Sequence, residues 1–205
     1  MQDQFNLDRT IRRTRIYRGR MSRMVTRRAL SAPCVYMHVP KCGGTSLSEA
    51  LYALVPLDRK IGILDSVSIR RALALHHAGV DEPARFHDEG EEAATIAAFR
   101  EQLLLAHLCH GCALVHGHFL FSERAFARFG PTHRFVSILR DPVTRTLSNY
   151  AMARRNGVIE GDFDAFLASA MGRRMAQHTL RYFAGVATVA PGKEAALVAR
   201  AKANM

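Results

Sequence analysis

The sequence contains no tryptophan, and it has only four lysines beside 25 arginines. Aromatic residues make up 8% of the chain and hardly any lie among its basic residues, which argues against a base-stacking surface for nucleic acid. No stretch approaches the roughly 18 to 20 consecutive apolar residues of a membrane span, and the N-terminus lacks the apolar core of a signal peptide. The arginine- and alanine-rich composition suggests a bacterial source, so we expect a cytoplasmic protein with at most peripheral contact with the inner membrane.

Cysteine is also scarce. Cys34, Cys42, Cys109 and Cys112 are too few for a disulfide framework in a chain of 205 residues. Only the last two form a CxxC pair, in LAHLCHGCALVHGHF, where histidines provide further candidate zinc ligands. A zinc finger or ribbon needs a second ligand pair at ordinary spacing, which this segment does not offer. We therefore expect no bound metal, although zinc at this pair stays an alternative that a metal assay would settle.

Positive charge is concentrated at the N-terminus. Of the net charge of +11, residues 1–28 hold nine Arg against Asp3 and Asp8, a net +7, and the remaining 20 basic and 16 acidic residues leave +4. This segment has too little apolar surface to fold alone, so we expect a flexible basic arm. The arm is either simply solvated or contacts an anionic lipid or polymer. Residues 29–205 are expected to form a single domain.

Short apolar runs alternate with helical patterns after residue 30, which favours an α/β fold with a largely parallel sheet. Strands are expected at 34–39, 113–117 and 134–139. Residues 56–100 mix apolar, acidic and histidine residues, and they could hold an inserted segment that faces a substrate. Within and after this region, helical spacing is weaker, at 66–76 and 91–108.

Two helices are predicted more firmly, each directly after an expected strand. The first spans 46–54, with Ser46 and Glu49 as a capping box. The second begins at Pro142, with Asp141 as its N-cap, and ends before Arg154. Its spacing predicts a buried face with these apolar residues: Val143, Leu147 and Tyr150.

The segment VYMHVPKCGGTSLSEAL joins the first expected strand to the first of these helices through a glycine turn. Such a junction directs backbone N–H groups and the positive end of a helix dipole at one point, where an anion can bind. The order of residues differs from G-x-x-x-x-G-K-[ST], because the lysine precedes the glycines, and no acidic magnesium ligand is evident in a following strand. A tight turn with a simple helix cap is the alternative.

A second strand-to-helix junction, FVSILRDPVTRTLSNY, also carries groups suited to an anion. Arg140 lies at the end of the expected strand, and Ser148 follows two helical turns later. Because arginine is the default basic residue of this chain, Lys41 before the glycines suggests a need for a compact ammonium group. Two such strand ends fit a ligand with anionic groups at both ends.

These motifs resemble those of carbohydrate sulfotransferases related to heparan sulfate 2-O-sulfotransferase, the sulfotransferase family 2. VPKCGGTSL is similar to their 5'-phosphosulfate loop, and FVSILRDPVTRTLSNY to their 3'-phosphate motif, in which Arg and Ser are eight residues apart. VHGHF resembles the histidine segment of the uronyl 2-O-sulfotransferase branch, and MAQHTLRYFAG resembles a downstream element. The four segments occur in the order of the family over residues 33–185.

The resemblance implies a P-loop nucleotide-kinase-like three-layer fold and a sulfotransferase that uses PAPS (3'-phosphoadenosine 5'-phosphosulfate), releases PAP and needs no metal. The phosphosulfate would be held by the loop residues Lys41, Cys42, Gly43, Gly44, Thr45 and Ser46. Arg140 and Ser148 would hold the 3'-phosphate. Lys41 would stabilise charge on the leaving group, while His118 would act as general base with the help of His116.

The resemblance implies less for the C-terminal part of the chain. Gln177 and Arg181 are candidate substrate or cofactor contacts, because AQHTLRY matches the family pattern only in part. Catalytic domains of the family generally continue beyond the point that corresponds to Met205, so we expect the C-terminal part of the domain to be incomplete.

Other functions remain open at this point. A P-loop-type phosphotransferase is disfavoured by the missing GK[ST], and a catalytically inactive sulfotransferase fragment would keep the same motifs. A basic protein that binds nucleic acid or an acidic polymer through its arm is a third class. The leading expectation is transfer of a sulfuryl group to a sugar or glycan hydroxyl, with the acceptor and the oligomeric state unspecified.

Overall fold

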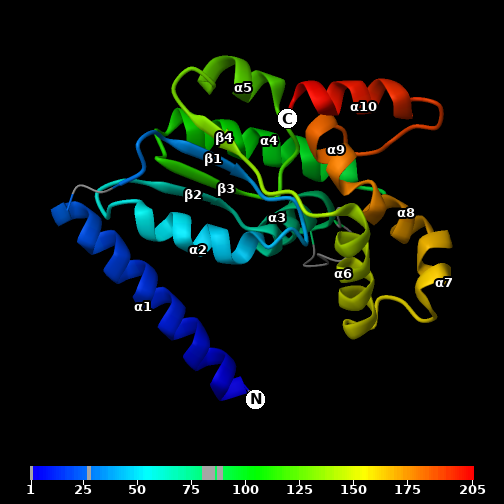
Figure 1. Cartoon of the computed structure of the whole chain (residues 1–205), viewed down its shortest axis with the longest axis horizontal. Coiled ribbons are helices and arrows are strands. Elements are labelled where there is room, and N and C mark those ends of the chain that lie inside the picture. The colour runs from blue at the N-terminus through cyan, green and yellow to red at the C-terminus, as the bar shows by residue number, and fades with distance from the viewer. Residues whose placement is uncertain (1, 27–28, 80–85, 87–89) are drawn as a thin grey trace.

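The computed structural model describes residues 2–26, 29–79, 86 and 90–205 (Figure 1). One sheet of four parallel strands lies at its centre, in the order β2-β3-β1-β4. The strands are β1 (Cys34–Met37), β2 (Ile61–Leu64), β3 (Leu114–Gly117) and β4 (Arg134–Val136). The predicted α/β fold with a parallel sheet is therefore confirmed. The sequence does not predict β2, because this strand is four residues long and lies in a segment of mixed composition.

Helices fill most of the remaining described chain. They are α1 (Gln2–Thr26), α2 (Gly44–Leu54), α3 (Ser66–Ala78), α4 (Ala93–Cys109), α5 (Glu123–Phe129), α6 (Pro142–Arg155), α7 (Phe163–Ala168), α8 (Ala170–Ala176), α9 (His178–Ala184) and α10 (Glu194–Ala203). Helix α3 begins at its predicted residue, and α4 lies within two residues of its prediction. Part of the region where an inserted segment was expected, residues 80–85 and 87–89, lies outside the described residues.

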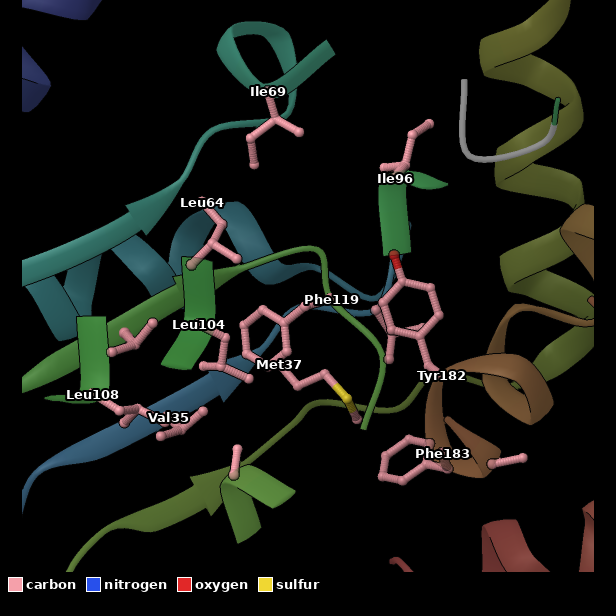
Figure 2. Close-up of a cluster of buried hydrophobic side chains, with 14 of the residues drawn as sticks. Val35, Met37, Leu64, Ile69, Ile96, Leu104, Leu108, Phe119, Tyr182 and Phe183 are labelled. Carbon is pink, nitrogen blue, oxygen red and sulfur yellow. The ribbon is translucent and has the colours of Figure 1, made fainter. Parts of the chain in front are cut away.

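The two faces of the sheet pack against different helices. All four residues of β1 are buried, as in the central strand of a parallel sheet covered on both sides. Cys34 and Tyr36 pack toward α2, whereas Val35 and Met37 belong to the larger cluster with Leu104 of α4. Figure 2 shows Val35, Met37, Leu104 and Phe119 together in this larger cluster. The domain therefore has three layers, with α2 and α4 on opposite faces of the sheet.

The start of α2 differs from the prediction. Its N-cap is Gly43, in the left-handed region at φ 81°, and no side chain caps the helix, so the predicted capping box of Ser46 and Glu49 is wrong. The helix begins two residues earlier than expected because Gly43 turns the chain directly after the loop. The N-terminal N–H groups of α2 are therefore not occupied by a side-chain cap of the helix.

The buried face of α6 also differs from the prediction. Asp141 caps the helix and Pro142 follows it, as predicted, but Val143 and Leu147 are 63% and 44% exposed. Arg145 and Asn149 are buried instead, at 1% and 0% exposed. This face is buried because it packs against α8. The guanidinium of Arg145 donates hydrogen bonds to the main-chain oxygens of the last two residues of α8, at 2.8 and 2.7 Å.

Residues 2–26 form the single helix α1, where the sequence predicts a flexible arm. Its second half packs against α2, with Gly19 so close to Ala53 that a Cβ atom would collide. Arg20 donates to the main-chain oxygens of Val55, Pro56 and Arg59 at 2.9–3.1 Å. The predicted end of the arm, at residues 27 and 28, lies outside the described residues.

Candidate functional site

A large cavity lies where β1, β3 and β4 end. It has a volume of about 550 Å³, and its lining comes from the loops after these strands and from α2, α3, α6, α8 and α9. The described residues that line it are His38, Pro40, Lys41, Gly43, Gly44, Thr45, Ser46, Ser66, Arg70, His118, Arg140, Ser148, Asn149, Met152, Met175 and His178. Parallel sheets commonly bind ligands beyond the carboxyl ends of their strands. Most of the residues singled out from the sequence meet in this cavity.

The loop after β1 forms one wall of the cavity. Lys41 adopts a left-handed conformation at φ 65°, which is unusual for a residue other than glycine, and Gly43 does so at φ 81°. A Cβ atom on Gly44 would overlap the ring of His38, so only glycine fits at that position. Glycine at these two positions therefore lets the loop turn tightly into α2 and lets the ring of His38 lie against the first residue of that helix.

Positive charge dominates the cavity. Lys41, Arg70 and Arg140 line it, and none of its described lining residues is an Asp or Glu. The guanidinium of Arg140 lies 3.5 Å from the main-chain oxygen of Lys41. Burial, and next the charges of Arg155 and Arg140, lower the pKa of Lys41 below its ordinary value. Such a site favours an anionic ligand, which would relieve the repulsion between these cations.

Helix α6 contributes two polar side chains next to each other, Ser148 and Asn149. Asn149 is fully buried, and neither its amide nitrogen nor its carbonyl oxygen has a hydrogen-bond partner within the described residues. Buried amides without partners are rare because losing hydrogen bonds to water costs free energy. A bound group with both donors and acceptors would satisfy Asn149, which supports a polar ligand in this cavity.

His118 follows β3 and lines the cavity beside His38. Its Nδ1 lies 2.7 Å from the main-chain oxygen of His38, so Nδ1–H donates to that oxygen. In the neutral ring the lone pair is then on Nε2. The rings of His118 and His38 stack with their centroids 4.4 Å apart. A hydrogen bond that fixes the tautomer in this way is what a general base at Nε2 requires.

His116 is not among the described residues that line the cavity, and it contacts the ring of His38 instead. The hydroxyl of Tyr52 lies 2.6 Å from Nδ1 of His116, and Nε2 of His116 lies 3.4 Å from Nδ1 of His38. The short first distance is typical of a hydroxyl donor, so we assign the proton of His116 to Nε2 and that of His38 to its Nε2, which is directed at Gly44. His38 is thus a hydrogen-bond donor beside the loop.

Burial keeps this pair of rings neutral. Desolvation, followed by the neighbouring imidazoles of His118 and His116, lowers the pKa of His38 to about 3. Desolvation and then His118 lower the pKa of His116 to about 4. Both rings therefore donate or accept hydrogen bonds without carrying charge at neutral pH. The expected role of His116, to assist His118 or to position the substrate, stays a prediction.

Three further predicted residues lie away from the cavity wall. The side chain of Cys42 is buried in the core, although its backbone belongs to the loop. Gln177 is at the junction of α8 and α9 and is not among the described lining residues. Arg181 is buried, donates to the main-chain oxygen of Arg174 at 3.3 Å, and borders a separate, much smaller cavity.

Several lining residues are not predicted from the sequence. His38 directly precedes the loop, and its position at the end of a predicted strand could have indicated that it lies at the site. Asn149 follows Ser148, but the helical repeat places it away from the predicted apolar face of Val143, Leu147 and Tyr150. Arg70 of α3 and His178 of α9 come from segments whose patterns indicate no site.

The two cysteines of the CxxC pair differ in exposure. Cys109 is exposed and Cys112 buried, and the Sγ of Cys112 lies 3.9 Å from Nδ1 of His107. In the part of the chain that the structure describes, no group of three or more His, Cys, Asp or Glu residues is arranged to hold a metal ion. The described helices also include none with the length and apolarity needed to cross a bilayer.

The chain was compared with family models, curated proteins and solved structures. No family model, curated protein or solved structure matches it.

Proposed function

We propose that this protein transfers a sulfuryl group from PAPS to a hydroxyl of a sugar or glycan. The observation that carries the proposal is that one cavity is lined by both strand-end anion motifs and by a histidine with a fixed tautomer. Lys41 and the glycine loop, Arg140 with Ser148, and His118 come from three different strand ends of the parallel sheet. The fold assignment, a P-loop nucleotide-kinase-like domain, is part of the same proposal.

The lining residues fit a donor with anionic groups at two places. The backbone N–H groups at the start of α2 and the hydroxyls of Thr45 and Ser46 would hold the 5'-phosphosulfate, since this helix end has no side-chain cap. Arg140 and Ser148 would hold the 3'-phosphate, which distinguishes PAPS from an ordinary adenylate. The amide of Asn149, which has no hydrogen-bond partner among the described residues, is a further polar group that such a ligand would use.

PAPS supplies an activated sulfuryl group, and the protein contributes position and charge. The acceptor oxygen forms a bond to sulfur while the bond from sulfur to the 5'-phosphate oxygen breaks. Lys41 places an ammonium where the leaving oxygen gains charge, and its lowered pKa makes it a better proton donor there. His118 takes the proton of the acceptor hydroxyl at Nε2, the nitrogen left with the lone pair by the bond to His38.

His38 would assist as a neutral donor. Its Nε2–H is directed at the loop, and the chain of contacts from Tyr52 through His116 sets this tautomer. A neutral donor beside the phosphosulfate stabilises developing charge without repelling Lys41. His116 therefore acts as a positioning residue in this proposal.

The experiment that tests the proposal is a transfer assay with radiolabelled PAPS and a panel of sugars and glycans, including polymers with uronic acids. Label should appear in at least one acceptor, and His118→Ala should lower the rate by about 10²- to 10⁴-fold, the usual contribution of a general base. His133→Ala, at a histidine outside the cavity, is the control and should keep the wild-type rate. Magnesium-dependent turnover of ATP without transfer from PAPS would favour a phosphotransferase instead.

A further inference from the structure

We propose that the exposed face of α1 binds the surface of an anionic phospholipid membrane. The interaction does not depend on the chemistry of the cavity, because none of the described lining residues belongs to α1. In Figure 1, α1 runs beside α2 near its own C-terminal end, and its N-terminal end extends away from the body of the protein. The helix is thus attached on one side and open on the other.

The attached side is defined by three contacts. Gly19 lies against Ala53, and Arg20 holds the carbonyl groups beyond the end of α2. Arg12 forms an ion pair with Glu49 of α2 at 3.4 Å. These contacts fix the rotation of α1 about its axis, so they also determine which side chains face away from the protein.

The side that faces away carries large apolar residues. Placed at the helical repeat of 3.6 residues, they fall within less than half of the circumference, opposite Gly19. Their exposed fractions run from 48% for Ile11 to 85% for Val25, and the set is Ile11, Tyr17, Met21, Met24 and Val25. Among the described apolar side chains of α1, Ile16 lies on the attached side and the other five collect on the face that the protein leaves uncovered.

Arginines border this apolar face. Arg13 and Arg15 lie at its two edges, Arg18 lies within it, and residues 9–28 contain no Asp or Glu. A helix of this kind places its apolar side chains at the boundary of headgroups and acyl chains while its cationic side chains contact anionic headgroups. An anionic lipid surface would therefore contact both the arginines and the apolar side chains of this face.

Other partners fit this face less well. A second copy would place the same arginines against one another, so the charges would repel. Nucleic acid would contact the arginines but would leave the apolar side chains exposed, since Tyr17 is the only aromatic residue of the set. A membrane satisfies both kinds of side chain.

The absence of tryptophan gives a direct test in the full chain. Tyr17→Trp introduces a single tryptophan on the proposed face, and Val143→Trp introduces one on α6 at a residue of similar exposure, 63% against 60% for Tyr17. With vesicles of phosphatidylcholine and phosphatidylglycerol, we expect the tryptophan emission of the Tyr17→Trp variant to shift to the blue and to be quenched by brominated lipid. High salt should abolish both effects. The probe on α6 should show no shift.

Vesicle flotation then measures the apolar and the cationic contributions to binding separately. Met21→Ser with Val25→Ser, and Arg13→Gln with Arg18→Gln, should each weaken binding to the anionic vesicles by about tenfold or more. Arg124→Gln with Arg128→Gln on α5 is the matched charge control and should bind as the wild type does. Equal shifts for both tryptophan probes, no binding of wild type at low salt, or unchanged binding by both α1 variants would overturn the proposal. Self-association that the Met21 and Val25 change abolishes, without vesicle binding, would overturn it in favour of a dimer.

Discussion

Lys41 and Arg140 come from different strand ends, yet they lie close enough for the guanidinium of one to contact the backbone of the other. Their chemistry differs. The ammonium of Lys41 has a lowered pKa and lies 3.7 Å from the sulfur of Met152, whereas Arg140 is exposed and presents a planar fork. In the proposed reaction, this difference would suit Lys41 to the leaving group and Arg140 to a phosphate that does not react.

Removal of each cation should therefore affect a different measured quantity, turnover for Lys41 and PAP affinity for Arg140. Lys41→Ala should lower turnover by about 10²- to 10³-fold with a modest change in PAP affinity, because its charge acts mainly in the transition state. Arg140→Ala should mainly raise the Kd for PAP, by about 10- to 100-fold for a lost charged hydrogen bond. Calorimetry and steady-state rates measure both, and equal, trivial effects would refute the assigned roles.

The neutral histidines predict how stability changes with pH. The folded pKa values of about 3 for His38 and about 4 for His116 lie below the ordinary 6.5, so the unfolded chain binds protons that the folded chain does not. The free energy of unfolding should therefore be unaffected by these rings above pH 6.5 and should fall as the pH is lowered toward about 4.

Urea unfolding at pH 7.5, 5.5 and 4.5 measures this dependence. The double variant His38→Gln and His116→Gln should lose less stability over this range than the wild type. His76→Gln, at an exposed histidine of α3, should keep the wild-type dependence. If all three proteins show the same slope, the two rings are not held neutral by folding.

At the scale of elements, the local sequence pattern of α6 predicts where the helix begins but not which of its faces is buried. Its N-terminus follows from Asp141 and Pro142, whose capping chemistry is local. The buried face of α6 does not follow from the local sequence, because this face packs against α8. The main-chain carbonyl groups of α8 accept hydrogen bonds from Arg145, so Arg145 is buried there and the apolar residues are not. Strands β1, β3 and β4 are similarly predictable from short apolar runs, whereas β2 and α5 depend on tertiary packing.

Asn149 on α6 should separate ligand binding from stability. Asn149→Ala removes a buried amide without partners, so the ligand-free protein should be equally stable or more stable by up to about 1 kcal/mol. Affinity for PAP should fall about tenfold, because the ligand loses that amide. Thr146→Ala is the matched control, since Thr146 is also buried but bonds to Pro142 within α6.

Thermal unfolding and calorimetry measure the two effects. The control should lose about 1 kcal/mol of stability and keep its affinity for PAP. A large loss of stability in ligand-free Asn149→Ala would contradict the view that this amide is directed at a ligand.

At the scale of the whole molecule, the parallel sheet creates the site. It brings the ends of β1, β3 and β4 side by side, so residues 41, 118 and 140 line one cavity, as the order of motifs in the sequence leads us to expect. The contacts among Tyr52, His116 and His38 could not be predicted, because they depend on the register between β1 and β3 and on the rotation of α2. Local sequence patterns therefore predict the anion-binding loop, but they do not predict the contacts of Tyr52 and His116 that position His38 beside it.

The central claim is that the cavity recognises the two anionic ends of PAPS. Isothermal titration of the full chain with PAP, AMP and ATP, with and without magnesium, tests it most directly. PAP should bind at least about tenfold more tightly than AMP or ATP without magnesium, since one charged hydrogen bond to the 3'-phosphate contributes about 1.5–3 kcal/mol. No binding of PAP, or a preference for ATP with magnesium, would contradict the proposal.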